Sequence, residues 1–258
     1  MRLIRPVVLA VLLIAISCRH QGETSGPYTN DAMLFPVSRN SKWGFIDRRG
    51  KLVIPPQFDA VQIPEEPGKS SFSEGLAAAC VGKCDYVYPD ALAPKPGEDL
   101  PKFMHKRYEG RWGYIDGTGG MVISPRFTSA SRFVNGHASV LAGERWLDSS
   151  VDERWGYIDR TGHFLIEPQF DEARDFDRGS GLAVVCLGKM GATRCGYIDL
   201  TGKFIINPQF FGAWEFTDAV ARVWLTKDSV SDKPSYINRA GQVIWNGDDA
   251  TGGDEHGH

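Results

Sequence analysis

The sequence predicts an all-β fold, a tandem array of about five three-stranded antiparallel β-meanders that is open or only partly closed. The segment Trp-Gly-Tyr-Ile-Asp occurs at 112–116 and 155–159, and near-copies stand at 43–47, 195–199 and 234–238. The second position of this segment, glycine in four copies and serine in the fifth, recurs after 69, 43, 40 and 39 residues. A repeated period of about 40 residues is typical of arrays in which each unit packs on its neighbours.

Each copy continues into a predicted hairpin. The pattern Asp-x-x-Gly or Asn-x-x-Gly separates two apolar runs, because Asp or Asn hydrogen-bonds to the backbone of the turn and Gly adopts its left-handed conformation. This predicts turn capping, and not paired catalytic acids, for Asp47, Asp116, Asp159, Asp199 and Asn238.

A Pro-x-Phe corner follows the return strand and is predicted to end it, since proline cannot donate to a strand ladder. Its prolines are Pro56, Pro125, Pro168 and Pro208. A polar arc then leads to a short Ala-rich strand. Residues 31–37 look like such a strand, whereas no such strand follows the last Trp-Gly copy. If each unit is therefore taken to start with its Ala-rich strand, the chain contains five units, each made of an Ala-rich strand, a Trp-Gly strand and a return strand. A propeller-like ring is the alternative closure, although three strands are few for a propeller blade.

The full pattern is [KR]-W-G-[FY]-I-D-x-x-G-x-x-[VLI]-I-x-P-x-F followed by F-x-x-G-x-A-x-V, and it resembles the WG-repeat family of bacterial lipoproteins and other envelope proteins. The match covers nearly all of residues 31–246. The resemblance implies an all-β binding platform without shared catalytic residues. Cys195 and Pro234 depart from the pattern, because each replaces the tryptophan.

The first residues have the order of a secretory signal. Arg2 and Arg5 precede an uncharged apolar run at 7–16, which is shorter than the roughly 20 residues of a spanning helix. Residues 1–17 are therefore predicted to be a signal peptide. The segment Ala-Ile-Ser-Cys at 15–18 resembles a bacterial lipobox, which implies lipidation of Cys18 and attachment to a membrane. Ordinary signal cleavage near Ser17 is the alternative.

The signal indicates a bacterial cell envelope location, and Arg19 after the cysteine suggests the outer membrane by resemblance to Gram-negative sorting. Residues 18–30 are the lipidated cysteine and a polar, flexible tether, 31–246 the β domain with an insertion at 81–110, and 247–258 a disordered tail. Without residues 1–17, 27 basic residues stand against 32 acidic ones, a net charge of −5. This mildly acidic balance does not indicate nucleic-acid binding.

Four further cysteines stand in the predicted exported domain, where disulfides can form. Cys186 and Cys195 flank a short loop between adjacent strands, and Cys80 and Cys84 are separated by three residues. Disulfides Cys80–Cys84 and Cys186–Cys195 are predicted. A metal site of Cys80, Cys84 and His105 is the weaker alternative, since its ligands are loosely spaced. No metal and no cofactor are predicted.

Some aromatic residues do not recur between units and are therefore candidates for contact with a partner. They are Tyr86, Tyr88, Tyr108, Trp146 and Trp224. The loops between the Ala-rich and Trp-Gly strands vary in length and leave from one edge, as expected of a binding face. The longest, at 81–110, is either part of that face or a disordered insertion.

The expected function is that of a lipid-anchored, non-enzymatic protein-interaction module, with another envelope protein as partner. A glycan or peptidoglycan ligand is an alternative, because exposed aromatic rings stack on sugars. An envelope hydrolase is the alternative from another class, although the sequence contains no G-x-S-x-G, HExxH or phosphate-binding glycine loop. The scattered His105, His137 and His163 are predicted to be solvated or locally hydrogen-bonded.

Overall fold

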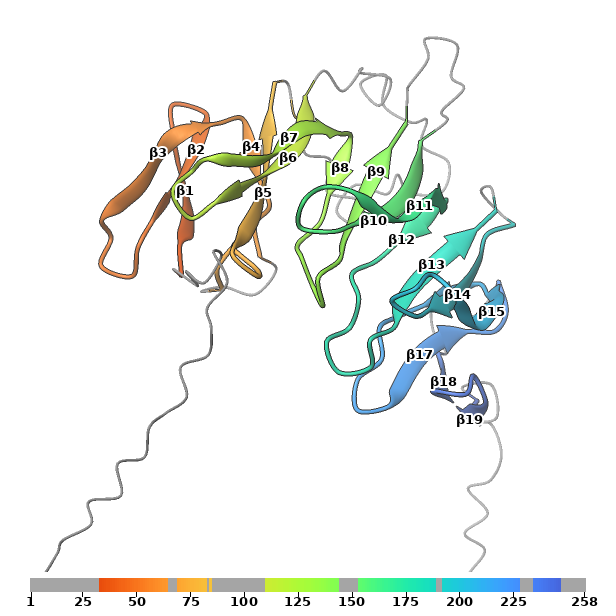
Figure 1. Ribbon diagram of the computed structural model, residues 1–258. Coiled ribbons are helices and arrows are strands. Elements are labelled where there is room, and N and C mark those ends of the chain that lie inside the picture. Colours follow the sequence, from red (N-terminus) through yellow and green to blue (C-terminus); the bar gives the residue numbers. More distant parts are fainter. Residues whose placement is uncertain are drawn as a thin grey trace, which may run out of the picture.

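The computed structural model describes residues 33–64, 69–82, 84, 110–143, 153–188, 192–227 and 234–246. In this part of the chain all regular structure is strand, arranged as five small antiparallel sheets that follow one another along the sequence (Figure 1). None of these sheets closes into a barrel. The predicted all-β array of open meanders is therefore confirmed.

The first sheet has three strands, β1 (Phe35–Arg39), β2 (Lys42–Ile46) and β3 (Leu52–Phe58). Each later sheet has four, in the order arc strand, Ala-rich strand, Trp-Gly strand and return strand. The second has β4 (Ala60–Val61), β5 (Leu76–Val81), β6 (Arg111–Asp116) and β7 (Met121–Phe127). The third has β8 (Ser129–Ala130), β9 (Ala138–Ala142), β10 (Arg154–Ile158) and β11 (Phe164–Phe170). The fourth has β12 (Glu172–Ala173), β13 (Ala183–Leu187), β14 (Arg194–Ile198) and β15 (Phe204–Phe210). The fifth has β16 (Gly212–Ala213), β17 (Val220–Trp224), β18 (Ser235–Asn238) and β19 (Val243–Trp245).

The arc strands add one strand to four of the five predicted meanders. Each has only two residues and starts directly after the return strand of the preceding sheet, as β4 does after β3. In β4, Ala60 pairs with Cys80 and Val61 with Ala79. Two residues are too few to show strand periodicity, so the sequence pattern did not reveal them. Because an arc strand hydrogen-bonds to the next sheet, it joins successive units.

The return strands do not end at their prolines, so that prediction was wrong. Strand β3 continues two residues past Pro56 to Phe58. Its pairing changes from Ile54 opposite Phe45 to Phe58 opposite Trp43, so four steps along β3 oppose two along β2. The extra residues form a bulge, where a strand tolerates proline because no ladder hydrogen bond is required from its nitrogen.

The same bulge explains the glycine of the Trp-Gly pair. A Cβ on Gly113 would lie 2.3 Å from the carbonyl oxygen of Ile123, and Gly44, Gly156 and Gly196 show the same conflict at 2.4–2.7 Å. The bulged return strand thus lies directly over a residue that has no room for a side chain. Ser235 takes this place in the fifth sheet, where β19 ends at Trp245 and continues into no Pro-x-Phe bulge.

Four buried clusters lie between successive sheets, so each inner sheet contributes one face to each of two cores. The core between the second and third sheets contains Tyr114 and Ile123 from one side and Phe133, Val140 and Ile158 from the other. The cores between the other pairs are built in the same way. Stability is thus shared between neighbouring units, as in other repeat proteins.

A buried tyrosine hydroxyl ties each inner sheet to the next arc. The hydroxyls of Tyr114, Tyr157 and Tyr197 donate to the carbonyl oxygens of Ser131, Arg174 and Trp214 at 2.8–2.9 Å, always 17 residues ahead. Burial raises the pKa of the Tyr114 and Tyr157 phenols, with the Asp175 charge adding to the effect. These hydroxyls therefore remain protonated donors.

Replacing Tyr157 by Phe is expected to lower the free energy of unfolding by about 1–2 kcal/mol, because the Arg174 carbonyl loses a donor inside the array. The matched control is Tyr236→Phe in the fifth sheet. Tyr236 is 38% exposed and no such bond forms to it within the described residues. Urea unfolding of the two variants is the measurement, and equal losses would contradict the assigned role of the Tyr157 hydroxyl.

The Asp-x-x-Gly turns are capped as predicted. One carboxylate oxygen of Asp159 accepts hydrogen bonds from the backbone N–H groups of Thr161 and His163 at 2.8 and 2.9 Å. Asn238 makes the equivalent bonds with its side-chain oxygen. The turn glycine has positive φ in every unit, and in the later four units it packs on an isoleucine of the preceding return strand, as Gly202 does on Ile166.

The turn carboxylates should make stability depend on pH. The Thr201 hydroxyl and the backbone N–H groups of Thr201 and Lys203 lower the pKa of the Asp199 carboxyl. Since an unfolded Asp titrates near pH ~3.9, this contribution is present above that pH and is lost as the pH falls through the lower folded value. The stability of wild type relative to Asp199→Asn should therefore decrease between pH 6 and pH 2.5, measured by urea unfolding. Asn238→Asp should acquire the dependence in the reciprocal test, and a difference independent of pH would contradict it.

Candidate functional site

The outer face of the fifth sheet presents a group of aromatic side chains around an arginine. Arg222 on β17 pairs with Tyr236 on β18, which pairs with Trp245 on β19, so the three lie in one row across the strands. Trp224 lies two residues beyond Arg222 on the same face. Trp214 follows β16 and donates its backbone N–H to the Arg222 carbonyl oxygen at 3.0 Å. We call the surface of Trp214, Arg222, Trp224, Tyr236 and Trp245 the end face.

The end face corresponds by register to an interior surface of the fourth sheet. There Val184 pairs with Tyr197 and Tyr197 with Ile206, in the row that Arg222, Tyr236 and Trp245 form in the fifth sheet. Tyr197 is 0% and Ile206 4% exposed, because the fifth sheet covers them, whereas Tyr236 is 38% and Trp245 56% exposed. The end face is thus a packing surface that no further described unit covers.

Two arginines stack on the tryptophans of this region. The guanidinium carbon of Arg222 lies 5.2 Å from the ring centre of Trp214 and 5.5 Å from that of Trp224. Arg174 lies 4.3 Å from the Trp214 ring on the fourth-sheet side, and its Nη1 is 3.5 Å from a carboxylate oxygen of Glu215. Contacts at these distances hold a guanidinium over an aromatic face.

Polar groups of the end face are left with unused donors. Within the described residues, Arg222 forms no ion pair, and the indole nitrogens of Trp214 and Trp224 have no hydrogen-bond acceptor. Arginine and indole N–H groups donate and cannot accept. Because the two indole nitrogens are buried, the surface itself combines exposed aromatic area with the donors and the positive charge of Arg222.

Only part of the end face was predictable from the sequence. Trp224 was singled out as an aromatic residue outside the repeat, and the structure places Trp224 on the end face. Tyr236 and Trp245 were interpreted as ordinary repeat positions. The available signal was the change of Val184 to Arg222 and of Ile206 to Trp245 at positions that are apolar and buried one unit earlier.

The other predicted contact residues, Tyr86, Tyr88, Tyr108 and Trp146, lie outside the described residues, as does Cys18. Of the predicted loop edge, the structure describes the first loop, at 38–41, in full, and only the flanking residues of the four longer loops.

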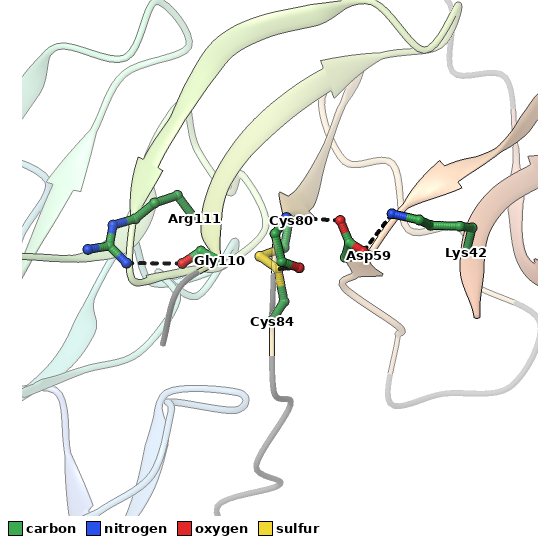
Figure 2. The surroundings of a disulfide bond; sticks show 7 residues. Lys42, Asp59, Cys80, Cys84, Gly110 and Arg111 are labelled. Carbon is green, nitrogen blue, oxygen red and sulfur yellow. Dashed lines mark hydrogen bonds and ion pairs between the residues drawn. A yellow bond between two sulfur atoms is a disulfide. The ribbon is translucent and has the colours of Figure 1, made fainter. Parts of the chain in front are cut away.

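The point where the insertion leaves the second sheet is pinned by a disulfide. Cys80 and Cys84 are paired at disulfide distance, with their Cα atoms 6.3 Å apart (Figure 2). Beside them, Asp59 accepts hydrogen bonds from the Lys42 ammonium at 2.6 Å and from the Gly82 N–H at 2.9 Å. Burial acts to raise the pKa of Asp59, but these two donors outweigh it and lower that pKa. The strand end that precedes the insertion is therefore fixed from two sides.

Cys186 and Cys195 face each other across β13 and β14, with their Cα atoms 4.0 Å apart, and are also paired at disulfide distance. Both predicted pairings are confirmed. Because Cys80 and Cys84 are paired, their sulfurs are not available to the alternative metal site, whose His105 lies outside the described residues.

Asp171 makes the same two kinds of contact as Asp59, and these contacts explain why a basic residue precedes Trp-Gly in the pattern. It accepts from Arg154 and from the Gly188 N–H. In the next unit Phe211 occupies this place, and the Arg194 guanidinium stacks on it at 3.7 Å. The basic residue of the pattern therefore has a contact within its own unit.

Two of the three histidines examined in the sequence are locally hydrogen-bonded, as predicted. The ring nitrogens of His137 lie 2.8 Å from the Asn135 carbonyl oxygen and 3.0 Å from that of Leu200. The Nδ1 atom of His163 lies 2.8 Å from the hydroxyl oxygen of Thr161 in its own turn. Both rings are thus engaged by neighbouring groups of the array.

In the described part of the chain, no three His, Cys, Asp or Glu side chains are grouped so that they could hold a metal ion. Nor does any helix there have the length and apolar character needed to cross a membrane.

A family model described as a WG containing repeat matches the chain at residues 43–83, 112–146, 155–190 and 196–223. These stretches cover 140 of the 258 residues, more than half of the chain. No curated protein matches it. Each matched stretch begins within a Trp-Gly strand, at the tryptophan in the first three and at Gly196 in the fourth. It runs through the bulged return strand and into the next Ala-rich strand.

Proposed function

Because this chain belongs to the WG-repeat family, we propose that it is a lipid-anchored protein of the bacterial envelope whose array acts as a non-catalytic protein-interaction module. The observation that carries the proposal is the end face, where Trp245, Tyr236 and Arg222 are exposed beside the half-buried Trp214 and Trp224 on the fifth sheet. Trp, Tyr and Arg are the residues most enriched where protein interfaces gain their binding energy.

The division of roles along the chain supports a scaffold with a grafted surface. The repeated residues have contacts within the array: turn aspartates cap hairpins, Trp-Gly glycines lie under bulges and tyrosine hydroxyls bind arcs. The end face departs from the repeat at Arg222 and Trp245. In repeat proteins, function resides in such surfaces laid over a constant frame.

The proposed anchor is a lipid on Cys18, with the tether 19–30 between membrane and array and the outer membrane as location in a Gram-negative host. It is supported by Arg2, Arg5, the apolar run at 7–16 and the lipobox-like residues 15–18. Incorporation of an alkyne-tagged fatty acid tests it: the full chain should be labelled and Cys18→Ser should not. Equal labelling of both forms would show that Cys18 does not carry the lipid.

Glycan binding is a second candidate, favoured by one observation. Trp245 is 56% exposed and Tyr236 38%, so both rings are open to stacking by a flat apolar ligand surface such as a sugar ring. The surface would then recognise glycan hydroxyls through the donors of Arg222.

The interaction proposal is tested by crosslinking capture from an envelope extract with the full chain, Trp245→Ala and the control Leu165→Ala. Leu165 is 48% exposed on β11, away from the end face, so its loss removes apolar surface elsewhere. The expected result is one protein enriched by the wild type and the control and lost with Trp245→Ala. Enrichment of glycan alone would favour the second candidate, and equal capture by all three forms would contradict the end face as the binding surface.

A further inference from the structure

We propose that the partner segment bound by the end face is an extended, acidic stretch of polypeptide, which occupies the place that each inner unit gives to the arc of its successor. This inference rests on the proposed function and specifies the partner's chemistry. It is carried by the way the three inner interfaces are made, and by what differs at the fifth sheet.

The inner interfaces show what this kind of surface receives. On the second, third and fourth sheets, the tyrosine hydroxyl donates to a backbone carbonyl of the following arc. The turn glycine of the following unit also packs on the return-strand isoleucine, as Gly241 does on Ile206. The occupant in each case is a segment of extended chain and a tight turn. Tyr236 presents the same hydroxyl on the fifth sheet, where it is exposed.

Carboxylates of two inner arcs pair with arginines. Asp175 and Glu215 stand at equivalent arc positions, where the arc of the third unit has Arg132, and each receives an arginine of the preceding arc, Arg132 at 3.1 Å and Arg174 at 3.5 Å. On the end face, Arg222 replaces the buried Val184 and lies between two tryptophans without an ion pair in the described chain. A carboxylate of the partner would form an ion pair with this guanidinium. A bidentate arginine–carboxylate pair is the strongest hydrogen-bonded contact that arginine makes.

The size of the face favours a segment over a folded surface. The four strands have two to five residues each, rise about 3.3 Å per residue and lie about 4.8 Å apart, so they offer roughly 200 Å². A stable complex between folded surfaces buries about 800 Å² on each side. Trp245, 56% exposed, stands where the buried Ile206 stands one unit earlier, so the face offers an aromatic ring on which such a segment can pack.

A peptide that copies residues 168–177, PQFDEARDFD, is a suitable probe, because this acidic arc covers the third sheet in the chain itself. Its fluorescein-labelled form would be titrated with the full chain and followed by anisotropy. The matched peptide has its four acidic residues replaced by their amides. The expected result is weak binding of the acidic peptide, with a Kd between about 1 μM and 1 mM, and about tenfold weaker binding of the amide form.

The protein variants place the binding. Arg222→Gln and Trp245→Ala should each weaken binding about tenfold, whereas Arg239→Gln, an exposed arginine in the turn of the same sheet, should leave it unchanged. Melting curves for all three check that folding is retained. Equal affinity for both peptides would overturn the acidic partner, and undiminished binding to Arg222→Gln would overturn the site.

Three further outcomes would also overturn the inference. Binding that appears only after removal of residues 247–258 would identify the chain's own tail as occupant. A concentration-dependent mass increase lost in Trp245→Ala would identify a second copy. If no peptide binds while capture from the extract still depends on Trp245, the acidic-segment inference fails and the proposed function stands. If capture from the extract is also independent of Trp245, both the acidic-segment inference and the end face as the binding surface of the proposed function are contradicted.

Discussion

Replacing Gly113 by Ala is expected to lower the free energy of unfolding by about 3 kcal/mol or more. The new Cβ would lie 2.3 Å from the carbonyl oxygen of Ile123 and 2.8 Å from the nitrogen of Pro125. Both obstacles are backbone atoms, so relief requires the bulged return strand β7 to move away from β6. That movement would break the pairing of Trp112 with Phe127 and of Tyr114 with Ile123. Overpacking that displaces backbone belongs to the most destabilising class of point substitution.

Gly117→Ala is the matched control in the same hairpin. A Cβ there would meet nothing within 4 Å, and the backbone is outside the left-handed region that favours glycine. The free energy of unfolding should therefore change by less than about 1 kcal/mol, because the reduced entropy of the unfolded chain offsets any small loss in the folded state. Urea unfolding followed by circular dichroism is the measurement. Similar losses in the two variants would show that glycine is needed for some reason other than the overlying bulge.

The second large effect is expected from Phe133→Ala, with a loss of about 3–5 kcal/mol. Phe133 is 0% exposed and lies in the core between the second and third sheets. Its ring centre is 4.9 Å from that of Tyr114, across the boundary between the two units. The cavity left by the lost ring would therefore weaken the interface between the two units as well as the third unit itself. Such interfaces make the units of a repeat array unfold cooperatively.

Unfolding of Phe133→Ala should consequently separate into two transitions, one for the part before the damaged interface and one for the part after it. Hydrogen exchange resolved along the sequence distinguishes the two parts. Leu165→Ala, at a site 48% exposed, should lose less than about 1 kcal/mol and keep a single transition. An unchanged midpoint for Phe133→Ala would contradict the placement of this core.

The candidate site was only partly accessible to sequence reasoning. Trp224 was recognisable because it has no counterpart at its position in other units. Tyr236 follows the repeat, and its exposure depends on whether a following arc covers it, which is a property of the neighbour and not of the residue. Arg222 and Trp245 become conspicuous only after strand register aligns them with Val184 and Ile206.

The sequence by itself determined the number of units, the hairpin turns and the two cysteine pairings. These depend on contacts close in the chain: Asp159 caps a turn within four residues, and the cysteines of each pair are 4 and 9 residues apart. Local hydrogen bonding and short loop closure leave few alternatives for such segments.

Only the tertiary structure decided how the units meet. The proline bulge over Gly113, the two-residue arc strands and the bonds from tyrosine hydroxyls to the next arc all join segments whose relation depends on strand register and on a neighbouring sheet. The end face follows from the same cause. A repeat specifies one packing surface per unit, but whether that surface is core or open to a partner depends on what lies against it in three dimensions.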